Sequence, residues 1–444
     1  MKKFTRLFAF LLILSFAIGV VSCAAATAPG GSYGDGYMGG GFKNDAEAPS
    51  DPSDSESEPG EEGGVAENKP VYLPSGMITA GAWNDNDNYA MWLELFKNEQ
   101  SSQDSSEVIQ AGKFNYFIQG GQSYWNCFNS RNRIKVSVTL GNEAVAGAEV
   151  VAYGKQNEVL YRAVTDAQGN AYLFTDAEDG TVEVSSGEGS ASAEFTAEGR
   201  ELSLVLDAKA EKLNVIELMF VVDVTGSMGD ELEFLRAELA DVIDKIAENN
   251  AGATIKLALL FYRDSDDKQK FHYVDFSDVG ERVNMQLCQR ELNDQRASGG
   301  GDYPEAVDEA LLKAVNAQWS TGATTKLIFH VLDAPAHNGK KYETNMINAI
   351  NLAAQKGIRI CPIICSGADT ITEYTMREAA IHTGGTFIFV TDDSGIGNSH
   401  YDPELPNVTV ELLNSMLVRL INGYHTGEFK EPIYWKQDPN LNQN

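Results

Sequence analysis

The stretch that decides the fold is Val215-Ile-Glu-Leu-Met-Phe-Val-Val-Asp-Val-Thr-Gly-Ser-Met228. Its first eight residues form a nearly continuous apolar run, which is typical of a strand buried on both faces of a sheet. Over residues 230–248 the apolar residues then recur at spacings of three and four, which predicts an amphipathic helix. A buried strand followed by such a helix indicates an α/β fold.

The same alternation continues toward the C-terminus. We expect further strands at 255–262, 271–276, 326–332, 358–364 and 386–390, and further helices near 279–292, 304–316, 342–356, 372–383 and 408–422. This order predicts a doubly wound α/β domain. In that fold, ligands bind beyond the carboxyl ends of the strands.

Three loops at such positions are rich in oxygen-bearing side chains. They read Asp223-Val-Thr-Gly-Ser-Met228, Ser298-Gly-Gly-Gly-Asp-Tyr-Pro-Glu305 and Asp333-Ala-Pro-Ala-His337. Hydroxyl and carboxylate oxygens are the ligands that Mg²⁺ prefers. The sequence therefore predicts a hard-cation site where the three loops converge.

These loops also carry a family resemblance. The region 213–424 resembles the von Willebrand factor type A (VWA) domain, whose metal-ion-dependent adhesion site begins with Asp-x-Ser-x-Ser; here it reads Asp223-x-Thr225-x-Ser227. The resemblance implies that the Thr and Ser hydroxyls bind the ion directly and that Asp223 acts through water. The third-loop acid is Asp333, whereas the second loop departs from the family by lacking the common Thr. The implied ligands are Asp223, Thr225, Ser227, Asp302 and Asp333, with Mg²⁺ as the ion and Ca²⁺ or Mn²⁺ as alternatives.

The resemblance implies a binding protein and not an enzyme, with a protein partner that presents an acidic side chain to the metal. One alternative is enzymatic, because Asp-x-Thr-Gly also resembles the phosphorylated loop of haloacid-dehalogenase phosphatases and P-type ATPases. Asp223 would then be the nucleophile, Lys326 would stabilise charge, and Asp392 and Asp393 would hold Mg²⁺. That reading lacks an Asp two positions after the nucleophile. A structural envelope protein with an inactive metal site is a further alternative.

A second folded region precedes the α/β domain. Seven short runs with period-two alternation, separated by turn residues, lie between 127 and 208 and predict a small β-sandwich. The runs 146–150 and 165–169 resemble the regulatory β-sandwich appended to some carboxypeptidases. It shows no catalytic pattern, so we expect a spacer or interaction module.

The N-terminus has the features of an export signal. Lys2, Lys3 and Arg6 precede the apolar run Phe8–Val21, which is too short for a comfortable membrane span. The run ends in Val-Val-Ser-Cys23, which resembles the bacterial lipobox. The resemblance implies a signal peptide over 1–22, a lipidated Cys23, and a protein anchored to the cell membrane and facing outward. In a diderm source this would be the outer membrane.

Composition and charge give expectations for the remaining regions of the chain. The chain of 444 residues carries 34 Lys and Arg against 64 Asp and Glu, a net charge of −30 that argues against nucleic acid as a partner. Residues 23–70 are acidic and poor in apolar side chains, which predicts a disordered tether. The segment 71–126 has no clear assignment, although Asx residues around Asp85 and Asp87 favour a helix cap over an EF-hand, whose Gly and Glu positions are not matched. Residues 425–444 form a tail.

The histidines and cysteines give two further expectations. His337, beside the third-loop Asp, is interpreted as loop architecture or a partner contact, since the six His residues show no zinc spacing. Cys361 and Cys365 share one predicted strand face about 13 Å apart at about 3.3 Å per residue, so they cannot bridge each other. We expect buried free thiols, with one bridge among Cys127, Cys288 and these two still possible.

Overall fold

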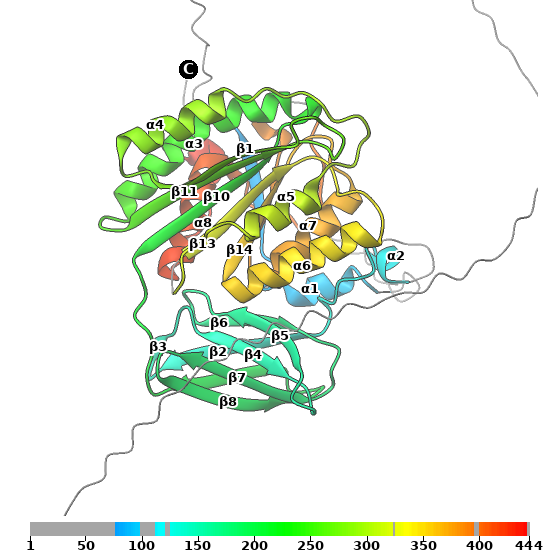
Figure 1. Cartoon of the computed structure of the whole chain (residues 1–444), viewed down its shortest axis with the longest axis vertical. Helices are drawn as coiled ribbons and strands as arrows, with labels where there is room; N and C mark the ends of the chain where they lie inside the picture. The colour runs from blue at the N-terminus through cyan, green and yellow to red at the C-terminus, as the bar shows by residue number, and fades with distance from the viewer. Residues whose placement is uncertain (1–75, 98–111, 120–124, 323–324, 395–398, 442–444) are drawn as a thin grey trace, which may run out of the picture. The chain divides into compact units, whose positions relative to one another are not determined.

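The computed structural model describes residues 76–97, 112–119, 125–322, 325–394 and 399–441 (Figure 1). The predicted signal peptide 1–22, Cys23 and the tether 23–70 lie outside these residues. No helix in the described ranges is both long and apolar enough to cross a bilayer.

An eight-stranded sheet forms the centre of the α/β domain. Its order is β12-β11-β10-β13-β14-β15-β1-β16. The strands from the predicted region are β10 (Val215–Asp223), β11 (Thr254–Tyr262), β12 (Phe271–Asp278), β13 (Thr325–Leu332), β14 (Ile358–Ile364) and β15 (Phe387–Val390). Those from β11 to β15 are parallel, with β12 antiparallel at the edge. The expected α/β class is confirmed.

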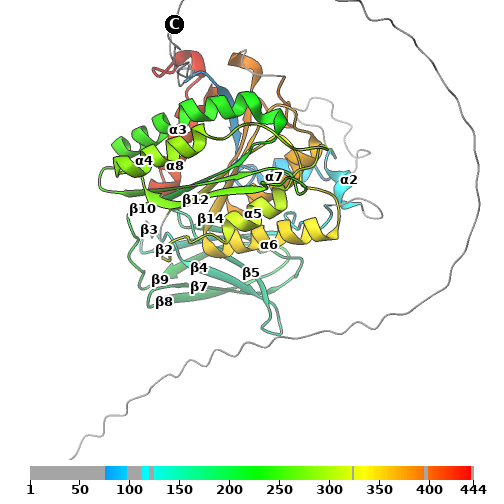
Figure 2. The ribbon, with the colours of Figure 1, turned by 45° about the horizontal axis from the view of Figure 1, so that its top comes forward.

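Both faces of this sheet are covered by helices, as Figure 2 shows. One face carries α3 (Gly229–Asn249), α4 (Arg282–Asn293) and α8 (Leu413–Thr426); the other carries α5 (Val307–Val315), α6 (Lys340–Lys356) and α7 (Thr370–Thr383). Alternate residues of β10 supply the two cores: Phe220 packs with the α3 and α8 side chains, and Met219 with those of α5 and α6. Burial on both faces is why β10 is a nearly continuous apolar run.

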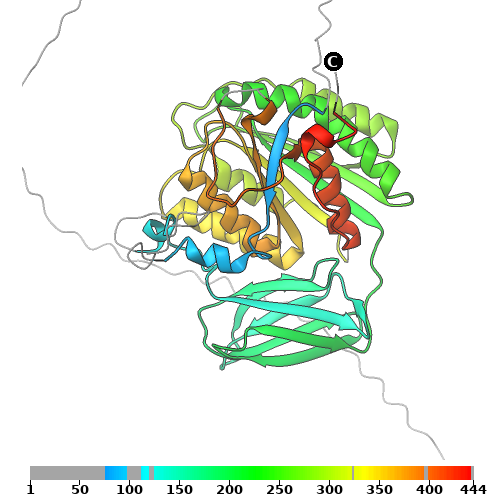
Figure 3. The same ribbon diagram turned by 180° about the vertical axis from the view of Figure 1, so that it is seen from behind.

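The segment without a sequence assignment belongs to this sheet. Strand β1 (Thr79–Trp83) lies between β15 and the short β16 (Glu411–Leu412), antiparallel to both, and passes beside α8 (Figure 3). Two short helices, α1 (Tyr89–Glu94) and α2 (Asn115–Ile118), follow. Asn88 is the N-cap of α1 but makes no capping hydrogen bond through its side chain. The expected Asx capping is therefore absent at this position.

Asp85 has a structural partner in α7. The Arg377 guanidinium, fully buried, donates to both Asp85 carboxylate oxygens, at 2.9 Å and 2.5 Å, and to Glu373 at 2.9 Å. Two carboxylates around one Arg explain why this charge can be buried at all. Asp85 therefore fastens the N-terminal segment to the α/β domain.

Residues 133–206 form two four-stranded sheets. One contains β3 (Glu143–Ala144), β2 (Arg133–Leu140), β6 (Asn170–Phe174) and β9 (Glu201–Leu206); the other contains β5 (Val159–Val164), β4 (Glu149–Tyr153), β7 (Gly180–Ser186) and β8 (Gly189–Phe195). Alternating residues of β2 and β7 are buried, as the period-two pattern predicts. These strands match the seven runs expected from the sequence, with the two-residue β3 added.

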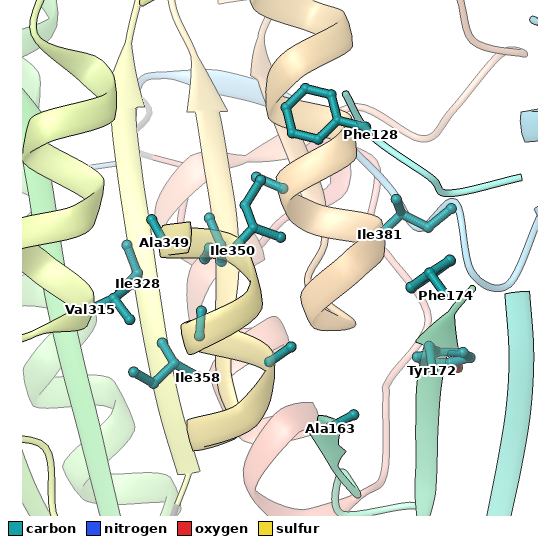
Figure 4. Close-up of a cluster of buried hydrophobic side chains, with 14 of the residues drawn as sticks. Phe128, Ala163, Tyr172, Phe174, Val315, Ile328, Ala349, Ile350, Ile358 and Ile381 are labelled. Carbon is teal, nitrogen blue, oxygen red and sulfur yellow. The ribbon is translucent and has the colours of Figure 1, made fainter. Parts of the chain in front are cut away.

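The small sheets share a hydrophobic core with α6 and α7. Phe174 and Tyr172 lie toward α7, where Figure 4 shows Ile381 beside Phe174. The His382 ring lies 4.3 Å from the Phe174 ring, and the Tyr161 hydroxyl donates to the His382 carbonyl at 3.3 Å. The two-sheet region therefore belongs to the same compact unit as the α/β domain.

Basic side chains gather at the end of the sheet opposite the predicted metal loops. Lys326 donates to the carbonyl of Lys356 at 3.1 Å, and Lys356 donates to that of Val315 at 2.8 Å. Arg359 donates to the carbonyl of Thr383 at 2.8 Å. Each acceptor ends a helix, where carbonyls lack intrahelical partners and the helix dipole favours a cation. These Lys and Arg side chains therefore cap the C-terminal ends of α5, α6 and α7.

The four cysteines of the described region, Cys127, Cys288, Cys361 and Cys365, are free thiols, and all but the half-buried Cys127 are fully buried. This agrees with the expected state.

Candidate metal centre

Three loops meet at the carboxyl edge of the central sheet, and backbone hydrogen bonds hold them together. The Ser298 amide donates to the Val224 carbonyl at 3.0 Å, and the Gly226 amide to the Gly299 carbonyl at 3.3 Å. The Glu305 amide donates to the Pro335 carbonyl at 3.0 Å. Because each loop is tied to the next, their polar side chains are positioned by backbone as well as by packing.

Asp223 ends β10 and is completely buried. Its Oδ1 accepts hydrogen bonds from the Thr225 amide at 2.8 Å and the Thr225 hydroxyl at 2.7 Å, while Oδ2 is buried without a partner. Burial raises the pKa of Asp223 to about 7; the Thr225 bonds oppose the rise and the Asp333 charge adds to it. The Thr225 hydroxyl lies 3.5 Å from that of Ser227, which is exposed.

Asp333 follows β13 and lies in the same cluster. It is 3% exposed, and its Oδ1 has no hydrogen-bond partner. Burial raises its pKa to about 6, the Ser227 hydroxyl counteracts this, and the Glu231 charge adds to it. Glu231 accepts from the Ser366 hydroxyl and amide through Oε1, but its Oε2 is also buried and unpartnered.

The second loop brings Glu305 to the cluster. Gly300 has a φ of +75°, and a side chain there would come within 2.8 Å of Glu305 Oε1 and 3.4 Å of Thr225 Cβ. The glycine therefore permits the close approach of Glu305 to the first loop. Glu305 Oε2 is buried and unpartnered. Burial is the largest cause that raises the pKa of Glu305, to about 9, and the negative charge of Asp223 is the next.

Asp302, the candidate second-loop ligand from the sequence, lies elsewhere in that loop. Its side chain is 67% exposed, and Oδ2 lies 4.0 Å from His337 Nδ1. The other ring nitrogen of His337 contacts Asp264 Oδ1 at 2.7 Å. The structure thus groups Asp223, Thr225, Ser227 and Asp333 together, and sets Asp302 beside His337.

The residues of the phosphatase alternative are not brought together. Lys326 pairs in register with Glu217, six residues before Asp223 on the neighbouring strand, which is about 20 Å away at about 3.3 Å per residue. Asp392 contacts His400 at 2.8 Å, and its side chain is 63% exposed. Lys326 is therefore too far from Asp223 to stabilise a phosphorylated intermediate there.

The buried acids fit a cation. In this cluster, four carboxylate oxygens are buried without a hydrogen-bond partner: Asp223 Oδ2, Glu231 Oε2, Glu305 Oε2 and Asp333 Oδ1. Among the described residues, no Lys or Arg forms an ion pair with any of these four acids. Buried carboxylates normally acquire a proton, a cationic side chain or a metal ion. An oxygen-only set of carboxylates and hydroxyls suits Mg²⁺, Ca²⁺ or Mn²⁺.

Comparison with known proteins agrees with the α/β fold. Residues 217–392 match the sequence model of the von Willebrand factor A domain family. This part of the chain is therefore a VWA domain, with β1 and β16 added to its sheet from outside the matched residues.

Three individual proteins show what the chain is similar to. The alpha-protein kinase vwkA of Dictyostelium discoideum is 26% identical over 130 residues, which span 29% of this chain and a fifth of that protein's length. The solved structure of the conserved hypothetical protein BatB from Bacteroides thetaiotaomicron is 15% identical, with a TM-score of 0.30, over 39% of this chain and 89% of that one. The open form of the pilus adhesin SpaC from Lactobacillus rhamnosus GG is 12% identical, with a TM-score of 0.34, over 62% and 36%. These scores are too low to establish a shared overall arrangement.

Sequence reasoning overlooked two acids of the cluster. Glu305 ends the Gly-Gly-Gly-Asp-Tyr-Pro-Glu loop, whose candidate ligand from the sequence is Asp302. The sequence feature that could have identified Glu305 is its position at the end of the second loop, just before α5, where its side chain is buried. Glu231 lies in the first turn of α3, where an acid reads as ordinary helix-terminus charge.

Proposed function

We propose that the VWA domain binds one divalent cation at the cluster of Asp223, Thr225, Ser227, Glu305 and Asp333, and that this ion serves metal-dependent binding of a protein partner. The observation that carries the proposal is the set of unpartnered carboxylate oxygens buried where three loops meet. Mg²⁺ is the ion we favour, because all the offered ligand atoms are oxygens. The family match supports the same proposal.

Each residue has a defined task in this proposal. Thr225 and Ser227 supply hydroxyl oxygens, and Asp223 fixes the Thr225 hydroxyl through a 2.7 Å hydrogen bond. Asp333 and Glu305 supply charge from the other two loops. When bound, the cation offers a coordination position to an acidic side chain of the partner, which a protein of net charge −30 would otherwise repel.

Calorimetric titration of Mg²⁺ into the chelator-treated full chain tests the site. We expect one ion per chain, loss of binding in Asp223→Asn, and unchanged binding in Asp266→Asn, which alters an exposed acid two residues beyond Asp264. Equal affinity in Asp223→Asn and the unmodified chain would contradict the proposal. Absence of Mg²⁺ binding at any concentration would favour the inactive-site alternative.

We also propose that the protein is not an enzyme. The support is geometric, because Lys326 caps α6 at the far end of the sheet and leaves Asp223 without a cationic neighbour among the described residues. Incubation with phosphate esters, and trapping with beryllofluoride, test this directly. Steady turnover that disappears in Asp223→Asn would overturn it.

Finally, we propose that the chain is an exported lipoprotein anchored through Cys23 on the outer side of the cell membrane. The support is the basic, apolar and Ser-Cys order of residues 2–23. Metabolic labelling with a palmitate analogue should mark the chain and fail to mark Cys23→Ala. Cys127→Ala is the matched control and should label normally; equal labelling of Cys23→Ala would contradict the anchor.

A further inference from the structure

Asp302 has a different set of neighbours from the cluster around Asp223. Three loops bring Asp264, Asp302 and His337 together, and each side chain offers one ligand atom within 4.8 Å of the other two. This is the one such group of His, Cys, Asp and Glu found in the described part of the chain. Asp264 lies just past β11, on a loop that supplies none of the proposed ligands of the first cluster.

From this arrangement we propose that Asp264, Asp302 and His337 form a second metal site, distinct from the cluster around Asp223, that takes a divalent transition metal ion such as Zn²⁺. The chemistry of the ligands separates the two sites. Imidazole nitrogen with carboxylate oxygen suits Zn²⁺ and its neighbours in the transition series, whereas Mg²⁺ prefers oxygen alone.

The spacing of the three groups is close to what such an ion requires. Ligand atoms on a tetrahedral ion with bonds of about 2.0–2.2 Å lie about 3.3–3.6 Å apart. His337 contacts Asp264 through Nε2 at 2.7 Å and faces Asp302 through Nδ1 at 4.0 Å, so an ion held by one of these ring nitrogens requires the carboxylate beside the other nitrogen to move. One ligand atom from each residue already lies within 4.8 Å of the other two, so the separations must shorten by up to about 1.5 Å. Asp302 is exposed and on a glycine-rich loop, so it can make that adjustment.

The inner part of the proposed site is already fixed. Asp264 is 5% exposed, and the His337 ring packs against the Tyr342 ring with centroids 5.4 Å apart. The exposed Asp302 leaves the outer side open to water or to a further ligand. Two anchored ligands and one mobile one are a workable frame for a solvent-accessible ion.

Charge favours a cation here. In the described ranges, the ion-pair contacts of Asp264 and Asp302 are with His337, and no Lys or Arg reaches either carboxylate. Asp267, which accepts from the Gly300 amide at 3.0 Å, adds another acid to the same loop region. A buried carboxylate such as Asp264 without a permanently cationic neighbour leaves room for a metal's charge.

The test is calorimetric titration of Zn²⁺ into the full chain in excess Mg²⁺ at about pH 7.5. We expect one Zn²⁺ per chain. Loss of a group that only supports a ligand lowers metal affinity by roughly 10- to 100-fold. Because His337 and Asp302 would be ligands themselves, His337→Gln and Asp302→Asn should each lower the Zn²⁺ affinity by more than that. Asp302 is exposed, so its substitution should leave folding intact, as far-ultraviolet circular dichroism would verify.

A matched control exists in a second His–Asp contact. His400 Nδ1 lies 2.8 Å from Asp392 Oδ1, but no third ligand completes that pair among the described residues. His400→Gln should therefore bind Zn²⁺ normally. In nuclear magnetic resonance spectra, Zn²⁺ should shift one imidazole signal, the one missing from His337→Gln.

Asp223→Asn separates this inference from the proposed function. Zn²⁺ binding should persist in Asp223→Asn even though Mg²⁺ binding is lost. If Zn²⁺ binding disappears in Asp223→Asn and survives in His337→Gln, the ion occupies the first cluster and the second site is refuted. Unchanged Zn²⁺ affinity in both His337→Gln and Asp302→Asn refutes it as well.

Discussion

Replacing Asp223 by Asn should stabilise the metal-free protein while removing its response to Mg²⁺. The substitution keeps the side chain's shape and an oxygen that can accept from the Thr225 amide and hydroxyl. It removes a negative charge that is completely buried beside Asp333. A change that destroys the site should therefore make the empty protein more stable.

The magnitude follows from the pKa. Burial raises the pKa of Asp223 from 3.8 to about 7, so between these values the folded state holds more protons than the unfolded state. Stability then falls as the pH rises through that window, by a total of about 4 kcal/mol at 1.36 kcal/mol per pH unit. In Asp223→Asn the amide nitrogen is buried where Oδ2 has no partner, which costs about 1–3 kcal/mol of stability and offsets part of the gain. A net gain of about 1–3 kcal/mol remains at pH 8, and almost none at pH 5.

Mg²⁺ should act in the opposite sense on the unmodified chain. An ion at a hundred times its dissociation constant adds about 2.7 kcal/mol to the stability. At about 2–4 °C per kcal/mol for a domain of this size, Tm should rise by about 5–10 °C. The rise should be larger at pH 8 than at pH 5, because protons compete for Asp223, Asp333 and Glu305 at the lower pH.

Scanning calorimetry at pH 5 and pH 8, with chelator or with Mg²⁺, measures all four conditions. Asp266→Asn is the control and should behave like the unmodified chain at both pH values. A metal-free Tm of the unmodified chain that does not fall between pH 5 and pH 8 would refute the electrostatic reasoning. A full Mg²⁺ response in Asp223→Asn would refute the assignment of the site.

Three further substitutions test the surrounding structure. Gly300→Ala should cost about 1–2 kcal/mol for its φ of +75° and weaken Mg²⁺ binding, because the new methyl meets Glu305 Oε1 at 2.8 Å; chemical denaturation and calorimetry measure the two effects. Normal Mg²⁺ affinity would exclude Glu305 from the site. Arg377→Met should cost about 3–5 kcal/mol in urea unfolding, since it leaves the buried Asp85 carboxylate without a cation while Glu373 keeps Lys113 at 3.1 Å, and a loss below about 1 kcal/mol would contradict the buried ion pair. Phe174→Ala should cost about 3–5 kcal/mol and lower one shared unfolding transition, whereas a separate early transition of the small sheets would show that they do not share a core with α7.

The sequence predicts the central sheet well because its strands carry a strong local signal. β10 and β13 are buried on both faces, so their sequences are mostly apolar, and polar loop residues mark their carboxyl ends. Asp223 at the end of β10 and Asp333 just after β13 lie at this edge of the sheet, as expected. For such strands the local sequence pattern alone is sufficient to predict their place in the buried sheet.

The sequence could not predict what depends on distant partners. β1 is five residues long and pairs with strands more than 300 residues away, so no local pattern reveals its place in the sheet. The choice between Asp302 and Glu305 likewise depends on which way a glycine-rich loop turns. That turn is set by the Glu305 amide bonding to Pro335 and by Gly300 bonding to Asp267, and both contacts come from other loops.

The position of β1 also bears on how the proposed anchor and the proposed metal site relate. Because β1 runs antiparallel to β15, its first residues lie at the carboxyl edge of the sheet, where Thr79 pairs with Thr391. This is the edge that carries Asp223 and Asp333. Glu238 of α3 accepts from the Gly76 amide at 2.7 Å and fixes the chain just before it enters β1. A lipid anchor at Cys23 would therefore transmit its pull to a strand held on both sides by antiparallel ladders.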